Sequence, residues 1–259
     1  MPTLEHNGSS FEVDEDGFLL KGDDFNTDWV DYVKGVEDFA IECSLLKVGA
    51  SEDIQNCADD GIQIFGGMGF SAETPMESAW RDARIGRIYE GTNEINRMLA
   101  VGMLLKKGLK GHLKLMEAIM TAATSLTQPF ETTTNKQDAL ETAAQMIHQS
   151  KTLFLVLLGN AAQKYGNELE QHQQILLDLA DVLIEVYFAE SCLLRTQKNI
   201  QRSSAEEQVH PIAMTVLYTF DAVQLTARKL KEVIISMTEN EEQQQLLQKW
   251  HPSCHPDRG

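Results

Sequence analysis

Hydrophobic positions recur at helical spacing along much of the chain. Over residues 171–201 they fall three or four residues apart, at Ile175, Leu179, Val182, Leu183 and Val186. This spacing places the apolar side chains on one face of a helix. Similar patterns predict helices over 137–160 and 208–238, with a break at Gly166-Asn167. We therefore expect a plain helical bundle in this part of the chain.

The N-terminal part has a different pattern. Apolar runs around Phe11 and Leu19 flank the pair Asp16-Gly17, and an Asp-Gly pair between apolar runs favours a β-hairpin. A helix is expected to start near Asp31. The predicted fold class is therefore all-α, a helical bundle with a small N-terminal β-hairpin near residues 11–20.

Residues 61–73 are expected to form a loop that is not helical, because glycines cluster there and disfavour a continuing helix. Thr74 and the proline after it are suited to start the next helix. A short break at 89–92 then opens another helix. We expect Trp80 and Ile95 to be substantially buried in these two helices.

Composition narrows the function classes. The chain has 42% hydrophobic and 7% aromatic residues, which is ordinary for a globular protein. Its formal net charge of −17 argues against nucleic acid and anionic membrane as partners, since both need clustered Lys and Arg. A polyanionic ligand that needs only a few local donors is not excluded. We find no integral membrane segment and no targeting segment, so we expect a cytoplasmic protein.

The C-terminal tail holds three possible metal ligands between His251 and His255. A zinc site usually has a second pair of ligands elsewhere in the chain, and the sequence has no such half-site. We therefore expect no metal site in this protein.

Glu90 is the strongest candidate for chemistry. It lies between Tyr89 and Gly91, just before the start of a predicted helix. A carboxylate held in an apolar pocket is a candidate general base, because desolvation raises its pKa towards the working pH. The glycine-rich stretch at 61–73 would let a ligand approach the backbone closely. Each feature alone is more often structural than functional.

Together these segments resemble one family. The runs QIFGGMGF, RDARI and IYEGTNEINR are similar to the C-terminal helical domain of acyl-CoA dehydrogenases. The resemblance is strong over residues 34–110 and continues to about residue 240, where it resembles the extra helical domain of longer family members. It implies three parts: an N-terminal hairpin segment (1–33), a partial catalytic domain (34–112) and an additional helical bundle (113–259).

The resemblance implies an activity, the FAD-dependent α,β-dehydrogenation of acyl-CoA thioesters in fatty acid β-oxidation. Glu90 would be the general base, and Gly91 would contact the thioester. The implied FAD contacts are Thr92, Asn93 and Glu94, together with Gln63, Ile64, Phe65, Gly66 and Gly67. In the family, the second group commonly touches a cofactor bound mainly by a neighbouring subunit, so a homo-oligomer is expected. Electron-transfer flavoprotein would reoxidise the flavin.

Other parts of the sequence depart from the family. Full members have an N-terminal helical domain and a middle β-domain before this region, so we expect a truncated or rearranged gene product. Residues 1–33 resemble the N-terminal segment of the small sulfur-relay proteins associated with dissimilatory sulfite reductase. The alternative to an enzyme part is a non-catalytic helical interaction or oligomerisation module derived from such an enzyme. A sulfur-relay adaptor is the least favoured hypothesis.

The sequence predicts weak or absent FAD binding by this chain alone, because the implied contacts form only one wall of a flavin site. Titrating the chain into FAD and following flavin fluorescence measures this. Tight stoichiometric binding would contradict the prediction.

Overall fold

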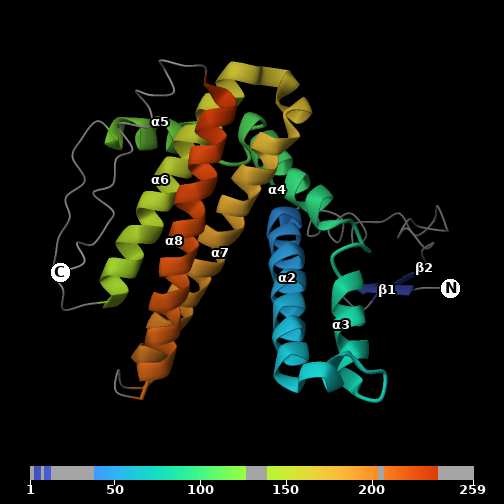
Figure 1. Ribbon diagram of the computed structural model, residues 1–259. Coiled ribbons are helices and arrows are strands. Elements are labelled where there is room, and N and C mark those ends of the chain that lie inside the picture. Colours follow the sequence, from blue (N-terminus) through green and yellow to red (C-terminus); the bar gives the residue numbers. More distant parts are fainter. Residues whose placement is uncertain (1–2, 7–8, 13–37, 127–138, 204–206, 239–259) are drawn as a thin grey trace. The chain divides into compact units, whose positions relative to one another are not determined.

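The computed structural model describes residues 3–6, 9–12, 38–126, 139–203 and 207–238 (Figure 1). It separates the chain into two compact units, residues 1–43 and 44–259. The helical elements are α2 (Ala40–Phe65), η2 (Gly66–Phe70), α3 (Pro75–Ile85), α4 (Asn93–Leu109), α5 (Leu115–Ser125), α6 (Ala139–Tyr165), η3 (Gly166–Gln171), α7 (Gln173–Arg202) and α8 (Val209–Met237). Among the described helices, none combines the length and the apolar composition that a membrane crossing requires.

The first unit contains a β-hairpin. Strands β1 (Thr3–His6) and β2 (Ser9–Glu12) pair antiparallel, with His6 opposite Ser9. The hairpin predicted near residues 11–20 falls mostly on residues 13–20, which lie outside the described residues. The sequence between the two strands is Asn7-Gly8, a pair that favours hairpin connections as Asp-Gly does.

The second unit contains the predicted helical bundle. Helices α6, α7 and α8 pack against one another (Figure 1), and their ranges confirm the three predicted helices to within a few residues. Leu158, Leu179 and Leu230, one from each helix, have no exposed surface. The core of the unit therefore lies between these three helices.

Two further helices pack on the bundle. Helix α4 packs against α7, and α5 packs against α6. A Cβ atom built on Gly159 would lie 2.5 Å from Ile119 Cγ2, so the glycine in α6 lets α5 approach closely. We did not predict α5, whose first residue follows Lys114 without a side-chain cap.

The expectation of a non-helical loop at 61–73 was wrong. Helix α2 continues to Phe65, and the 3₁₀ helix η2 follows it directly. A Cβ atom on Gly61 would lie 2.7 Å from Met76 Cε, so this glycine admits a side chain of α3 instead of ending the helix. The α-helix ends where Gly66 adopts a positive φ of 61°, a conformation that glycine reaches without strain.

Two side chains were expected to be buried. Trp80 is half-buried, and its Nε1 donates a hydrogen bond to Asp59 Oδ1. Ile95 is 53% exposed, so the prediction for Ile95 was wrong. Its place on the helical period suits burial, but no described residue covers that face of α4. Residues 31–37, where the first helix was expected to start, lie outside the described residues.

An ion-pair network joins four helices of the second unit. Arg97 of α4 donates from Nε to Asp181 Oδ1 at 2.6 Å and from Nη2 to Glu52 Oε2 at 2.9 Å. Lys229 of α8 lies 3.0 Å from Asp181 Oδ2 and 2.8 Å from Asp178 Oδ1. Arg97 thereby links α2 to α7 through α4, which fixes the start of α4 relative to the bundle.

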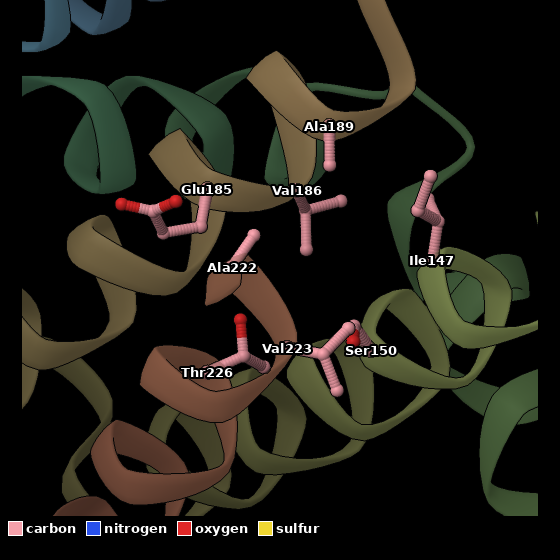
Figure 2. A pocket seen from close by; sticks show the side chains of 8 residues that line it. All are labelled: Ile147, Ser150, Glu185, Val186, Ala189, Ala222, Val223 and Thr226. Atoms are coloured by element: carbon pink, nitrogen blue, oxygen red, sulfur yellow. The ribbon is translucent and has the colours of Figure 1, made fainter. Parts of the chain in front are cut away.

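A narrow gap lies between α6, α7 and α8 (Figure 2). Its lining is mostly apolar, and it is too narrow to admit a water molecule. The one carboxylate on it belongs to Glu185 of α7, which accepts a hydrogen bond of 3.1 Å from the Tyr218 hydroxyl. Burial raises the pKa of Glu185, and the nearby carboxylates, Asp181 first among them, raise it further. We interpret the gap as a packing feature of the bundle, not as a ligand site.

Replacing Leu179 with alanine should lower the free energy of unfolding by about 2–5 kcal/mol, because it opens a cavity in a packed core. Leu194 is 58% exposed on the same helix, so Leu194→Ala should change stability by no more than about 0.5 kcal/mol. Urea unfolding of the two variants measures the difference. Equal losses would contradict the proposed core.

The stability of the chain should fall as pH rises through the titration of Glu185. The native state holds this proton more tightly than the unfolded chain does, so unfolding is favoured above the ordinary glutamate pKa of 4.5. Glu185→Gln keeps an acceptor for Tyr218 and removes the titration. It should therefore gain stability relative to the unmodified chain as pH rises from 4.5. Urea unfolding across that range tests this, with exposed Glu168→Gln as the control. The same pH trend in both variants would contradict it.

Candidate active site

A left-handed turn precedes helix α4. Glu90 has a φ of 55° and Gly91 a φ of 79°, and Glu90 is the only residue other than glycine with positive φ among those described. The left-handed conformation costs roughly 1–2 kcal/mol for a residue with a Cβ atom. Strain of this kind gathers at functional sites and persists only where the surroundings hold it. The structure therefore singles out the residue that the sequence predicted as the base.

Gly91 is required in this turn for two reasons. Its φ lies in the region that favours glycine, and a Cβ atom on it would lie 2.9 Å from Asn96 Nδ2. That Asn96 amide donates to the Gly91 carbonyl at 2.8 Å. The Nζ of Lys47, on α2, donates to the same carbonyl at 2.7 Å. Since hydrogen bonds contribute about 0.5–1.5 kcal/mol each, the pair can offset the cost of the left-handed turn.

The first residues of α4 are capped. The Thr92 hydroxyl accepts a hydrogen bond from the Ile95 N–H at 3.3 Å, as expected for an N-cap residue. The Asn93 N–H donates to the Arg87 carbonyl at 3.1 Å, closing the turn from the other side. Thr92 is half-buried, whereas Glu94 is exposed.

Asn93 has no exposed surface and is fully engaged within the chain. Its Oδ1 accepts from Lys47 Nζ at 2.8 Å, and its Nδ2 donates to Ser51 Oγ at 2.9 Å and to Glu52 Oε1 at 3.1 Å. The side chain therefore ties α4 to α2 from behind the turn. Its burial sets Asn93 apart from the other predicted cofactor contacts, most of which are exposed.

The Glu90 side chain is exposed, together with Gly91. The apolar residues around it are partly uncovered, with Ile88 at 48%, Tyr89 at 51% and Ile95 at 53% exposure. The described residues thus supply an apolar surface beside the carboxylate but do not enclose it. The apolar pocket that the sequence argument assumed around Glu90 is not formed by these residues alone.

The predicted contacts at Gln63–Gly67 lie at the far end of α2. Lys47, which contacts the turn, and Gln63 are about 24 Å apart along the helix axis, at a rise of about 1.5 Å per residue. The structure therefore brings together Glu90, Gly91 and the start of α4, but not the glycine-rich stretch.

The glycine-rich stretch presents an open surface. Ile64 is 83% exposed and Phe65 54% exposed. Nothing lies within 4 Å of a Cβ atom built on Gly66 or on Gly67. A broad, flat ligand could lie against the exposed apolar side chains and the bare backbone here, with the exposed Gln63 amide beside it. These residues fit the flavin cofactor expected from the sequence.

Sequence reasoning missed Lys47 and Asn96. Lys47 is the only lysine or arginine on α2, whose other charged residues are five acidic ones: Glu42, Glu52, Asp53, Asp59 and Asp60. A lone cation on an acidic helix was a signal that was available in the sequence. Asn96 had no such signal, because its role depends on the turn.

No group of three or more His, Cys, Asp or Glu side chains in the described ranges is placed to hold a metal ion. The tail at 251–255 lies outside those ranges.

The comparisons with known proteins all match the same family. Two family models, both described as acyl-CoA dehydrogenase, C-terminal domain, match residues 30–105 and 149–251. A probable acyl-CoA dehydrogenase of Bacillus subtilis is 39% identical over 216 residues, which is 83% of this chain and 36% of the relative. The rat mitochondrial very long-chain specific acyl-CoA dehydrogenase is 27% identical over 231 residues, 83% of this chain and 34% of the relative.

A solved structure agrees with these relatives. The crystal structure of an acyl-CoA dehydrogenase from Bacillus anthracis, complexed with FAD, superposes with a TM-score of 0.76 at 36% identity. It covers 81% of this chain, which in turn covers 35% of that protein.

The chain spans about a third of the length of these relatives. None of the comparisons supports the resemblance of residues 1–33 to sulfur-relay proteins. The matched regions include the turn at Glu90 and most of the bundle of α6, α7 and α8. The chain therefore belongs to the acyl-CoA dehydrogenase family, of which it carries the C-terminal helical part.

Proposed function

We propose that this chain supplies the general base, and part of the flavin-binding surface, for α,β-dehydrogenation of acyl-CoA thioesters. The observation that carries the proposal is the left-handed turn at Glu90 and Gly91, held by contacts from α2 and α4. A strained, exposed carboxylate at the start of a helix is suited to face a substrate. Membership of the acyl-CoA dehydrogenase family supplies the reaction class.

Glu90 would remove the α-proton of the thioester. This proton is weakly acidic, so its removal needs a positioned carboxylate, and a general base typically contributes about 10²- to 10⁴-fold in rate. Gly91 is exposed and has no side chain, which lets the thioester approach the backbone beside Glu90. The apolar side chains of Ile88 and Ile95 would exclude water from the carboxylate once other parts of the enzyme cover them.

FAD, when bound, supplies the acceptor that takes the β-hydrogen as a hydride. Thr92 and Glu94 lie next to Glu90 and would contact the cofactor at that site, with Asn93 supporting them from behind. Gln63, Ile64, Phe65, Gly66 and Gly67 lie at the other end of α2, which favours contact with the cofactor of a second copy. This arrangement would require a homo-oligomer.

Three further predictions come from the sequence alone. They are reoxidation of the flavin by electron-transfer flavoprotein, a cytoplasmic location, and the division of the chain into three parts at residues 33 and 112.

A helical interaction module without catalysis is the second candidate. Ile64, Phe70 and Ile95 are at least half-exposed in this chain, and such surfaces mark protein contacts as well as ligand sites. The two candidates differ in whether Glu90 is needed for anything beyond folding.

The test of the first candidate is Glu90→Gln in a complex of this chain with the domains that precede the matching region in its relatives. Glutamine keeps the shape of the side chain but does not accept the proton. Anaerobic bleaching of bound flavin by an acyl-CoA should slow by about 10²- to 10⁴-fold, with folding intact by circular dichroism. Glu117→Gln, an exposed carboxyl on α5, is the matched control and should bleach normally. Normal bleaching in Glu90→Gln would rule out this base.

A further inference from the structure

The side chain of Lys47 extends from α2 to the turn that precedes α4. Its Nζ lies 2.7 Å from the Gly91 carbonyl oxygen and 2.8 Å from Asn93 Oδ1. The side chain is half-buried. One ammonium group thus binds the residue directly after Glu90 and the first residue of the following helix.

A cation suits this position for a physical reason. An ammonium group offers three donors and no acceptor, so it can satisfy a carbonyl and an amide oxygen together. Hydrogen bonds from a charged donor are shorter and stronger than neutral ones. Asn96 donates to the same carbonyl from within α4, so Lys47 is the donor to the Gly91 carbonyl that comes from a different helix.

The direction of the Glu90 side chain depends on this contact. The left-handed φ angles of Glu90 and Gly91 set where the carboxylate points, and they are strained for Glu90. Without Lys47, the Gly91 carbonyl keeps only its local partner on α4, and the turn can relax towards ordinary φ angles. A small displacement of a catalytic group costs a large part of the rate, because proton transfer needs hydrogen-bond distance.

We infer that Lys47 is a positioning residue for Glu90: it holds the Gly91 carbonyl and thereby keeps the Glu90 carboxylate aimed at the substrate. The inference rests on the proposed function of Glu90 as the base. Lys47 acts through the backbone and is not itself a catalytic residue.

The first experiment measures the turn without any activity. The N–H of Asn93, bonded to the Arg87 carbonyl, reports on the turn by amide hydrogen exchange. Lys47→Met, which keeps the length of the stem and removes the ammonium, should speed exchange at Asn93 about ten-fold or more, the equivalent of losing one charge-assisted hydrogen bond. Lys106→Met, an exposed lysine of α4, is the matched control and should leave exchange unchanged.

Two further variants keep the test decisive. Lys47→Arg retains a charged donor and should restore much of the protection, whereas a general loss of packing would not be rescued in this way. If Lys47→Met does not fold by circular dichroism, Lys47→Gln, with a shorter neutral donor, replaces it. Unchanged exchange at Asn93 in a folded variant that lacks the ammonium overturns the inference.

The second experiment measures catalysis in the complex with the preceding domains. Lys47→Met should lower the rate constant of anaerobic flavin reduction at least ten-fold and leave the dissociation constant of the acyl-CoA unchanged. The kinetic isotope effect of an α-deuterated substrate should rise, because proton removal becomes slower. An equal loss in substrate affinity, or normal reduction in a variant with fast exchange, overturns the positioning role and leaves Glu90 intact as the base. Failure of the unmodified complex to reduce flavin overturns the proposed function instead, and the exchange result still reports on the Lys47 contact.

Discussion

Asn93 sits at the start of a helix, where backbone N–H groups lack partners within the helix, and its own side chain is fully buried. An amide in such a place is costly unless all its donors and acceptors are used. Lys47, Ser51 and Glu52 of α2 provide those partners. The position of the turn at Glu90 depends on these contacts, because they attach the first residue of α4 to α2. Removing Ser51 or Glu52 would take away one of the two acceptors of the Asn93 amide group.

Electrostatics connects this region to the bundle. The chain is strongly acidic, with a net charge of −17, and carboxylates gather where α2, α4 and α7 meet. Arg97 bridges Glu52 and Asp181 there. A part-buried ion pair of this kind contributes little net stability, because desolvation offsets much of the attraction, but breaking it is costly. Its main effect is to fix one arrangement of the helices, the one in which Glu52 also reaches Asn93.

The exposed apolar side chains near Glu90 and along Gln63–Gly67 have one physical consequence. A carboxylate beside water and one beside an apolar wall differ in basicity, because burial disfavours the charged form. The described part of the chain supplies the apolar side chains beside the Glu90 carboxylate but does not enclose the carboxylate. A ligand or a further surface that covered them would lower the exposure of the Glu90 carboxylate.

The helices of the bundle could be predicted from the sequence, because burial of one helix face requires apolar residues at helical spacing and this spacing is visible in the sequence. The candidate base was also found from the sequence, since Glu90 is followed by a glycine and by a capping threonine. The end of α2 was not predicted correctly. Gly61 is needed because Met76 of another helix packs against it, and local helix propensity does not indicate such a contact. The exposure of Ile95 depends equally on which segments cover α4. By itself, the sequence predicted the three long helices of the bundle and the candidate base. The tertiary structure alone decided what holds that residue, because Lys47 and Gly91 are far apart in the chain and meet only when α2 and α4 pack together.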